Sequence, residues 1–138
     1  MTPEREAVSG FRLSPQQAHL WALGPEARNA SMQCALLIEG ALDVPVLDAA
    51  LRRLVERHEI FRTTLGYLPG MSMPLQIVAE SSDARLLRAD PDLSSDGGRE
   101  EMIERLSREA AREPFDLATG PTLRAMLGTL SARAHVLV

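Results

Sequence analysis

One helix with a single apolar side constrains the fold of this chain more than any other feature. Asp43 is placed to cap the helix, and Pro45 falls in its first turn. Five residues repeat at the i, i+3, i+4, i+7 and i+8 spacing of one helical face: Leu47, Ala50, Leu51, Leu54 and Val55. Such a face has to pack against another layer, so we expect it to be buried.

Two further helices and several short strands are predicted around it. Ser14, Pro15 and Gln17 form a capping-box start for a short helix that Gly24 ends. A helix over 99–113 places apolar residues inward, namely Met102, Ile103, Leu106 and Ala110, and Pro114 ends it. Apolar and β-branched runs predict strands over 31–39 (buried), 59–65, 75–78, 84–88, 122–128 and 134–138, and turn residues predict a surface loop over 90–98. The fold class is therefore α+β.

Composition excludes several classes of function. The net charge of −4 over 138 residues argues against a nucleic-acid binder. All 15 cationic side chains are Arg, which excludes Schiff-base and P-loop chemistry that needs a Lys amine. Cys34 is the single cysteine, which excludes an internal disulfide and suits the reducing cytoplasm. Apolar runs reach only about five residues against the roughly 20 that span a bilayer, so we expect no membrane association.

Candidate catalytic and metal-binding groups are sparse. His19, His58 and His135 show no HxxxH or HExxH spacing, and Cys34 has no CxxC partner, so no metal site is predicted. Gly97-Gly98 precedes a helix without a GxGxxG pattern. His135 lies in an apolar strand, and we expect a core histidine with satisfied hydrogen bonds rather than a general base.

The last predicted strand has the character of an interior strand. The chain stops on Val136-Leu137-Val138. Since chain termini usually lie at a domain surface, we expect this sequence to be the N-terminal part of a larger domain.

Three segments resemble nonribosomal peptide synthetase condensation domains. Residues 14–23 (SPQQAHLWAL) resemble the first core motif, S-x-A-Q-x-R-L-W-x-L, with Gln16 and His19 as departures. Residues 57–65 (RHEIFRTTL) are similar to the second, R-H-E-x-L-R-T-x-F. Residues 115–124 (FDLATGPTLR) resemble the F-D-L-x-x-G-P-x-L-R segment that precedes the catalytic strand of the family.

The resemblance implies a chloramphenicol-acetyltransferase-like two-layer sandwich, of which this chain would be the N-terminal lobe only. Residues 1–12 would be a lead-in, and residues 13–138 the N-terminal subdomain. In the family, an aminoacyl amine attacks an acyl thioester to form an amide. Phosphopantetheine arms on peptidyl or acyl carrier domains hold both substrates, so no bound cofactor is expected. The implied partners are these carriers, an adenylation domain and the C-terminal lobe of the same domain.

The same resemblance assigns roles to motif residues. The family's catalytic His-His-x-x-x-Asp-Gly motif would follow Val138, so no catalytic residue is expected in this chain and it should be inactive alone. Arg62 would brace the active site by pairing with the Asp of that motif, and without that Asp it would need another acceptor, reach water or stay disordered. His58 and Glu59 would end the preceding helix and orient the strand. Arg57 is a matched position of the second motif, and Ser14, Gln17 and Trp21 are matched positions of the first. We expect Trp21, with Leu20 and Leu23, to be a core anchor.

Alternatives remain open. The loop Leu68–Met71 and the segment 74–78 resemble a branch of the family whose catalytic motif is altered, so the parent protein would condense substrates, modify side chains or have no activity. Another acyltransferase of the same fold is a second alternative. A third alternative is a non-catalytic docking lobe, which would serve only as a binding surface.

Overall fold

The computed structural model describes residues 10–24, 31–89 and 98–138. Its strands and helices follow one another as β1 (Gly10–Arg12), α1 (Pro15–Leu23), β2 (Leu36–Glu39), α2 (Val44–Arg57), the 3₁₀ helix η2 (Glu59–Arg62), β3 (Thr63–Gly66), β4 (Leu75–Val78), β5 (Leu86–Arg88), α3 (Gly98–Arg112), β6 (Ala125–Ser131) and β7 (Ala134–Leu137). The α+β class expected from the sequence is confirmed.

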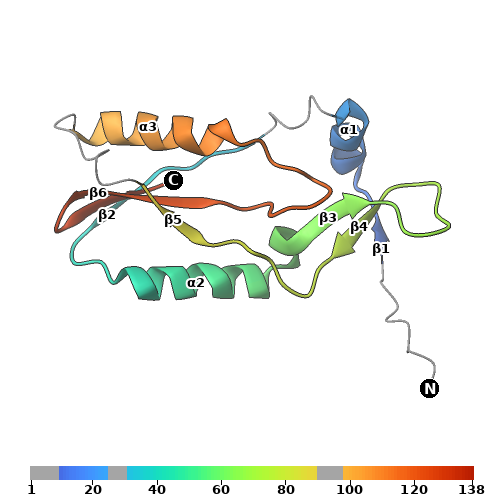
Figure 1. Cartoon of the computed structure of the whole chain (residues 1–138), viewed down its shortest axis with the longest axis horizontal. Helices are drawn as coiled ribbons and strands as arrows, with labels where there is room; N and C mark the ends of the chain where they lie inside the picture. The colour runs from blue at the N-terminus through green and yellow to red at the C-terminus, as the bar shows by residue number, and fades with distance from the viewer. Residues whose placement is uncertain (1–9, 25–30, 90–97) are drawn as a thin grey trace, which may run out of the picture.

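The larger sheet has four strands in the order β2-β7-β6-β5. β5 is parallel to β6, and the other pairs are antiparallel. β7 therefore lies inside the sheet, between a strand from the first third of the chain and the strand that precedes it. Figure 1 shows α3 on one side of this sheet and α2 on the other.

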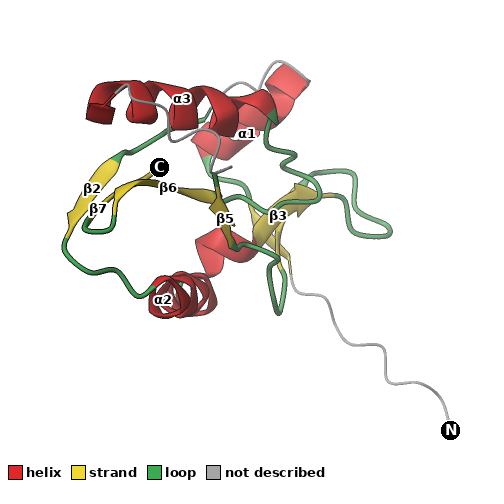
Figure 2. Cartoon of the chain, turned by 60° about the vertical axis from the view of Figure 1, so that its left-hand side comes forward, coloured by secondary structure: helices red, strands yellow, loops and turns green. Residues whose placement is uncertain are grey.

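The smaller sheet has the order β1-β4-β3, with both pairs antiparallel. It adjoins α1, and Figure 2 shows it beyond the β5 end of the larger sheet. The sequence suggested residues 1–12 as a lead-in. Within this range, Gly10–Arg12 form β1 and pair with residues 75–77 of β4. Residues 1–9, and all of the predicted loop over 90–98 except Gly98, lie outside the described part of the chain.

The core lies between α3 and the larger sheet. Met102 and Leu106 of α3 pack against Met126 of β6 and Val136 of β7, and the side chains of Leu106 and Val136 are fully buried. Two of the inward positions predicted for this helix are thus in the core, with Ile103 and Ala110 partly buried beside them. Burying a Leu or Val side chain stabilises a fold by about 1.5–3 kcal/mol, so this cluster holds the helix on the sheet.

The segment 59–65, predicted as one strand, divides into η2 and β3. The Thr63 hydroxyl donates to the carbonyl of Glu59 at 2.7 Å, and the Phe61 amide donates to the carbonyl of His58 at 3.1 Å. These local bonds favour a tight helical turn over the strand preference of Ile60 and Phe61. The prediction is wrong for residues 59–62 and confirmed for 63–65.

The structure also differs from the prediction of a buried strand over 31–39. Only Leu36–Glu39 form a strand, and it lies at the edge of the larger sheet. Because an edge strand is covered on fewer sides, Leu36 is 53 % exposed.

The apolar face of α2 is less buried than its spacing predicts. Val55 is buried, Leu47 and Leu51 are half-buried, and Ala50 and Leu54 are exposed. The cause is an apolar groove between α2 and the end of the larger sheet, which no described residue fills.

Candidate functional site

The second motif lies where α2 meets the smaller sheet. Arg57 is the last residue of α2, and its charge is favourable at the negative end of the helix dipole. His58 caps α2, its amide donating to the carbonyl of Leu54 at 3.0 Å, and its ring meets that of Phe61 edge to face at 6.2 Å. Glu59 begins η2 with an exposed carboxylate. These residues set the turn that carries Arg62 toward β3.

Arg62 is held by main-chain and side-chain acceptors. Its Nη1 donates to the carbonyl of Ala79, and its Nη2 is 3.5 Å from Oε1 of Glu59. The Ala79 amide donates back to the Arg62 carbonyl at 3.0 Å. The side chain is 16 % exposed, and its Nε is buried without a hydrogen-bond partner. Of the three outcomes that the sequence left open for Arg62, the structure shows another acceptor, and its Nε has no hydrogen-bond partner.

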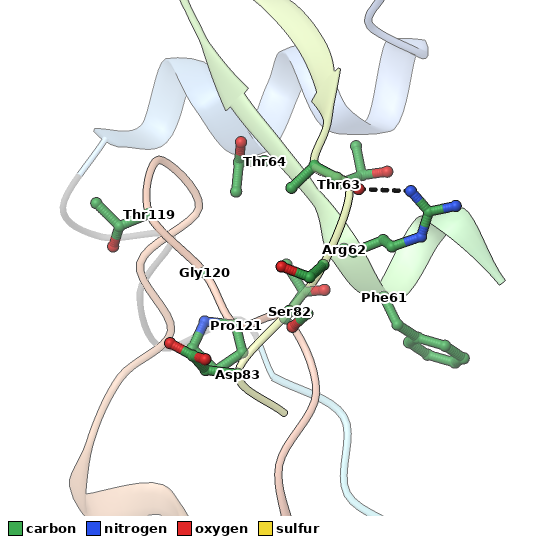
Figure 3. A pocket seen from close by; sticks show the side chains of 12 residues that line it. Phe61, Arg62, Thr63, Thr64, Ser82, Asp83, Thr119, Gly120 and Pro121 are labelled. Atoms are coloured by element: carbon green, nitrogen blue, oxygen red, sulfur yellow. Dashed lines mark hydrogen bonds between the residues drawn. The ribbon is translucent and has the colours of Figure 1, made fainter. Parts of the chain in front are cut away.

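A cavity of about 210 Å³ opens beside Arg62. Figure 3 shows its walls: Phe61, Arg62, Thr63 and Thr64 on one side, Ser82 and Asp83 after β4, and Thr119, Gly120 and Pro121 before β6. Its lining combines hydroxyl and main-chain groups with the carboxylate of Asp83, and the Arg62 guanidinium points away from Thr119 and Pro121 toward the Ala79 carbonyl (Figure 3). Such a lining suits a polar, hydrogen-bonding group better than an apolar one.

The F-D-L segment is bonded to the second motif. The Leu65 amide donates to the carbonyl of Leu117 at 2.7 Å, and the Thr122 hydroxyl donates to the carbonyl of Ile60 at 3.2 Å. A turn within the segment is closed by the Gly120 amide, which donates to the Asp116 carbonyl at 2.8 Å. The structure therefore brings together two of the three segments that the sequence singled out, from either side of α3.

Arg124, at the end of that segment, anchors the chain after α3. Its guanidinium lies 4.4 Å from the centre of the Phe115 ring and donates to the carbonyls of Glu113 and Pro114, the latter at 3.2 Å. This cation–π contact and the two bonds hold the segment against the start of β6.

The first motif starts α1 and holds it against the smaller sheet. The Gln17 amide donates to Oγ of Ser14 at 3.2 Å, and the Ser14 amide donates to Oε1 of Gln17 at 2.8 Å, so the predicted capping box is present. The same Gln17 side chain donates to Oε1 of Gln76 at 3.0 Å, and Nε2 of Gln76 donates to the carbonyl of Arg12 at 2.8 Å. These hydrogen bonds join α1 to β4 and β1. The first motif therefore lies apart from Arg62, which the spacing of the motifs in the sequence could not show.

Three apolar residues of α1 are less buried than expected. Leu20 and Trp21 are half-buried and Leu23 is exposed, so the expectation of core anchors is wrong for Leu23. The Trp21 ring packs edge to face on Tyr67, with centroids 5.9 Å apart. α1 covers only the margin of the smaller sheet, and this contact is its aromatic anchor.

His135 lies in β7 with only 7 % of its surface exposed, as expected of a core histidine. Its Nδ1 is buried and has no hydrogen-bond partner, so the expectation that its hydrogen bonds are satisfied is wrong. β7 is paired on both sides, and its main-chain acceptors are already used by β2 and β6.

The electrostatics of α2 centre on Asp48, which the sequence analysis missed. Its carboxylate pairs with Arg52, and Oδ1 accepts from the Leu86 amide of β5 at 3.2 Å. The bond from Arg52, followed by that from Leu86, lowers the pKa of Asp48 below its ordinary value of 3.8. The i, i+4 spacing of Asp48 and Arg52 was the available signal, whereas Ser82 and Asp83, also missed, gave none.

Among residues 10–24, 31–89 and 98–138, no cluster of His, Cys, Asp or Glu could hold a metal ion. In the same described part of the chain, every helix is too short or too polar to cross a membrane.

The chain combines a mixed sheet with helices on both faces, a smaller antiparallel sheet, and a polar cavity at the junction of two sequence motifs. These features define an α+β sandwich lobe. Residues 10–138 match the family model of the condensation domain, and the chain belongs to that family. It is 32 % identical over 117 residues to gramicidin S synthase 2 of Brevibacillus brevis, covering 83 % of this chain and 3 % of that protein. It is 37 % identical over 129 residues to isonitrile lipopeptide synthase of Mycobacterium tuberculosis, covering 91 % and 5 %.

Solved structures give the same fold. The first condensation domain of the calcium-dependent antibiotic synthetase superposes with a TM-score of 0.75 at 24 % identity, covering 94 % of this chain and 31 % of that one. The X-domain from teicoplanin biosynthesis, in complex with OxyB, superposes with a TM-score of 0.64 at 28 % identity, covering 99 % and 28 %. The chain thus spans less than a third of each of these two structures and a few per cent of the two synthases.

Proposed function

We propose that residues 13–138, together with strand β1, form the N-terminal lobe of a condensation domain in a nonribosomal peptide synthetase. Its partners are carrier domains, a C-terminal lobe and an adenylation domain, and it works in the cytoplasm. The substrates reach it on phosphopantetheine arms of the carriers. Support comes from the family match over residues 10–138 and from relatives that are gramicidin and lipopeptide synthases.

The reaction we assign to the complete domain is amide formation. The amine nitrogen of the acceptor attacks the carbonyl carbon of the donor thioester, forming a C–N bond. The C–S bond then breaks, and the amine proton is transferred so that a free thiol leaves on the donor arm. Tethering both reactants replaces a bimolecular encounter with a nearly intramolecular one, which lowers the entropic part of the barrier.

The observation that carries the proposal is the cavity beside Arg62. It is lined by residues of the second motif and of the F-D-L segment, and Arg62 in its wall has a buried Nε without a hydrogen-bond partner. An aspartate from a segment outside this chain would complete the hydrogen bonds of that guanidinium. We therefore assign Arg62 a positioning role and place the catalytic imidazole outside residues 1–138.

The test is a condensation assay on the longer polypeptide encoded with this chain. Donor and acceptor carriers, each loaded with a thioester, are mixed with that polypeptide, and the acceptor carrier is analysed by intact mass spectrometry. We expect the donor acyl group to be transferred to the acceptor. The chain of 138 residues alone, used as the control, should give no product above background. Absence of product from the longer polypeptide with every carrier pair would contradict amide formation.

A docking lobe without catalytic activity is the second candidate, favoured by one observation. The X-domain structure to which this chain is 28 % identical is a complex with another protein, OxyB. If the longer polypeptide retains carrier domains or a second protein in a pull-down but forms no amide, the docking function is the one supported.

A further inference from the structure

β5 is an edge strand of the larger sheet, and one of its main-chain amides is bonded to a helix instead of a strand. In the strand order of the sheet, β5 has β6 on one side only. The Leu86 amide of β5 donates to Oδ1 of Asp48 on α2 at 3.2 Å. Edge strands present amides and carbonyls to which a strand of another molecule can add. A side chain that occupies such an amide therefore affects association between molecules as well as packing within one.

The register of β5 shows which of its main-chain groups face outward. The Ala89 amide donates to the carbonyl of Leu127 in β6 at 3.0 Å, and Arg88 is the residue paired with Leu127. Because the main-chain groups of alternate residues bond to the same neighbour, those of Leu87 also face β6. The amides and carbonyls of Leu86 and Arg88 therefore point away from the sheet, and α2 reaches the first of these two residues.

Asp48 is fixed in the position that this bond requires. Oδ2 of Asp48 pairs with Arg52, one turn further along α2, so Oδ1 is left for the Leu86 amide. The Asp48 side chain is 21 % exposed, whereas that of Arg52 is 64 % exposed. A hydrogen bond to an ionised carboxylate is roughly twice as strong as one between neutral groups. A strand of a second molecule would therefore have to displace a charged acceptor that is already held through its other oxygen.

The rest of the β5 edge is apolar and accessible. Leu87 is 42 % exposed, and no strand within the described ranges pairs with this edge. Arg85 and Arg88 are exposed cations on either side of the two leucines of β5. In an antiparallel pair centred on those leucines, Arg85 of one molecule would lie opposite Arg88 of the other. Like charges at opposed positions destabilise a sheet, so the two arginines also disfavour pairing between copies.

We propose that Asp48 blocks the open edge of β5 and so prevents the larger sheet from pairing with a second copy of the chain. The carboxylate occupies the Leu86 amide, and Arg85 and Arg88 add repulsion between copies. Association between copies is independent of the reaction, so this role of Asp48 holds whether or not the complete domain forms amides.

Hydrogen exchange of the Leu86 amide, resolved by NMR, measures whether Asp48 protects it. We expect Asp48→Ala to raise the exchange rate at least tenfold relative to that of the Val136 amide, which lies in the middle of the same sheet. Asp48→Asn keeps an acceptor oxygen and should raise the rate less than threefold. The control is Glu56→Ala, which removes an exposed carboxylate of α2 and should leave the rate unchanged. An equal rise at Leu86 and Val136 would show general destabilisation and would overturn the proposal.

Sedimentation velocity measures association between copies. At about 1 M sodium chloride the Debye length is about 3 Å, so Arg85 and Arg88 repel little. We expect Asp48→Ala to dimerise there at a protein concentration at least tenfold lower than the wild type does. Arg88→Pro removes an outward amide and no bond to β6, so adding it to Asp48→Ala should restore the behaviour of the wild type. Equal dimerisation of the wild type and Asp48→Ala would overturn the proposal. So would dimerisation that persists in the double variant, because another surface would then be responsible.

Discussion

At the scale of single residues, Gly128 shows how closely β6 approaches α3. A Cβ at this position would lie 2.7 Å from Sδ of Met102 and 2.9 Å from Cδ1 of Leu106. Both distances are shorter than van der Waals contact, so the helix and strand are separated by a space that only a hydrogen atom fits. The conformational freedom of glycine plays no part here, because the requirement is steric.

We expect Gly128→Ala to lower the free energy of unfolding by about 1–3 kcal/mol, because it overpacks the core between Met102 and Leu106. Urea unfolding followed by circular dichroism measures the loss. Gly66→Ala is the matched control, since its Cβ would lie at an acceptable 3.4 Å from Cδ1 of Ile77 in the smaller sheet. A loss at Gly66 as large as that at Gly128 would contradict the steric explanation.

At the scale of elements, α2 is held to the larger sheet by a charge as well as by apolar contacts. Asp48 accepts from the Leu86 amide of β5 and pairs with Arg52 on its own helix. The apolar face of α2 is incompletely covered on this side of the sheet. The Asp48 carboxylate therefore contributes more to the position of α2 than an exposed charge usually contributes to a fold.

Asp48 makes stability depend on pH in the acid range. Because its pKa is lowered in the folded chain, its contribution is present above the unfolded value of 3.8 and is lost as the pH falls through the lower folded value. We expect Asp48→Asn to lower the melting temperature at about pH 7 and to have a smaller effect at about pH 3. Thermal unfolding across this range measures the difference, with Glu56→Gln, an exposed carboxylate on the same helix, as the control. An equal effect of Asp48→Asn at both pH values would show that its charge does not contribute.

The helices were predictable from sequence because each carries its own local signals. Asp43 caps α2 through the Val46 amide at 3.1 Å, and the Ser14–Gln17 capping box starts α1 as predicted. The short strands were less predictable. The bond from Thr63 to Glu59 favours a helical turn over the β propensity of residues 59–62, and the strand that contains Leu36 lies at a sheet edge rather than in its interior. For the site, motif spacing identified Arg62 but gave no sign that Ser82 and Asp83 would lie across the cavity, because that depends on how the loop after β4 folds.

At the scale of the whole molecule, the cavity beside Arg62 and the apolar groove lie on either side of the segment that leads into β6. Both carry interactions that are incomplete within this chain: a buried Nε without a partner, and an apolar wall without a cover. The two features flank residues 119–125, which line the cavity on one side and the groove on the other.

We expect Arg62→Ala to destabilise the longer polypeptide more than the 138-residue chain. In the chain alone it removes hydrogen bonds to Ala79 and Glu59, a loss of about 1 kcal/mol. In the longer polypeptide it also leaves the partner carboxylate buried without a counter-charge, a loss of about 3–5 kcal/mol. Denaturant unfolding of both proteins measures the two losses, with Arg53→Ala on the exposed side of α2 as the control. Equal losses in the two proteins would refute the positioning role of Arg62.

The pairing of Leu36 with Leu137 also affects how the chain is made. A ribosome adds about 5–20 residues per second, so β2 leaves the exit tunnel roughly 5–20 seconds before its neighbour in the sheet leaves it. Throughout that interval its leucines and main-chain amides are exposed in the nascent chain. A chaperone that binds short apolar stretches would protect it until β7 arrives, so the order of strands makes translation speed part of the folding of this molecule.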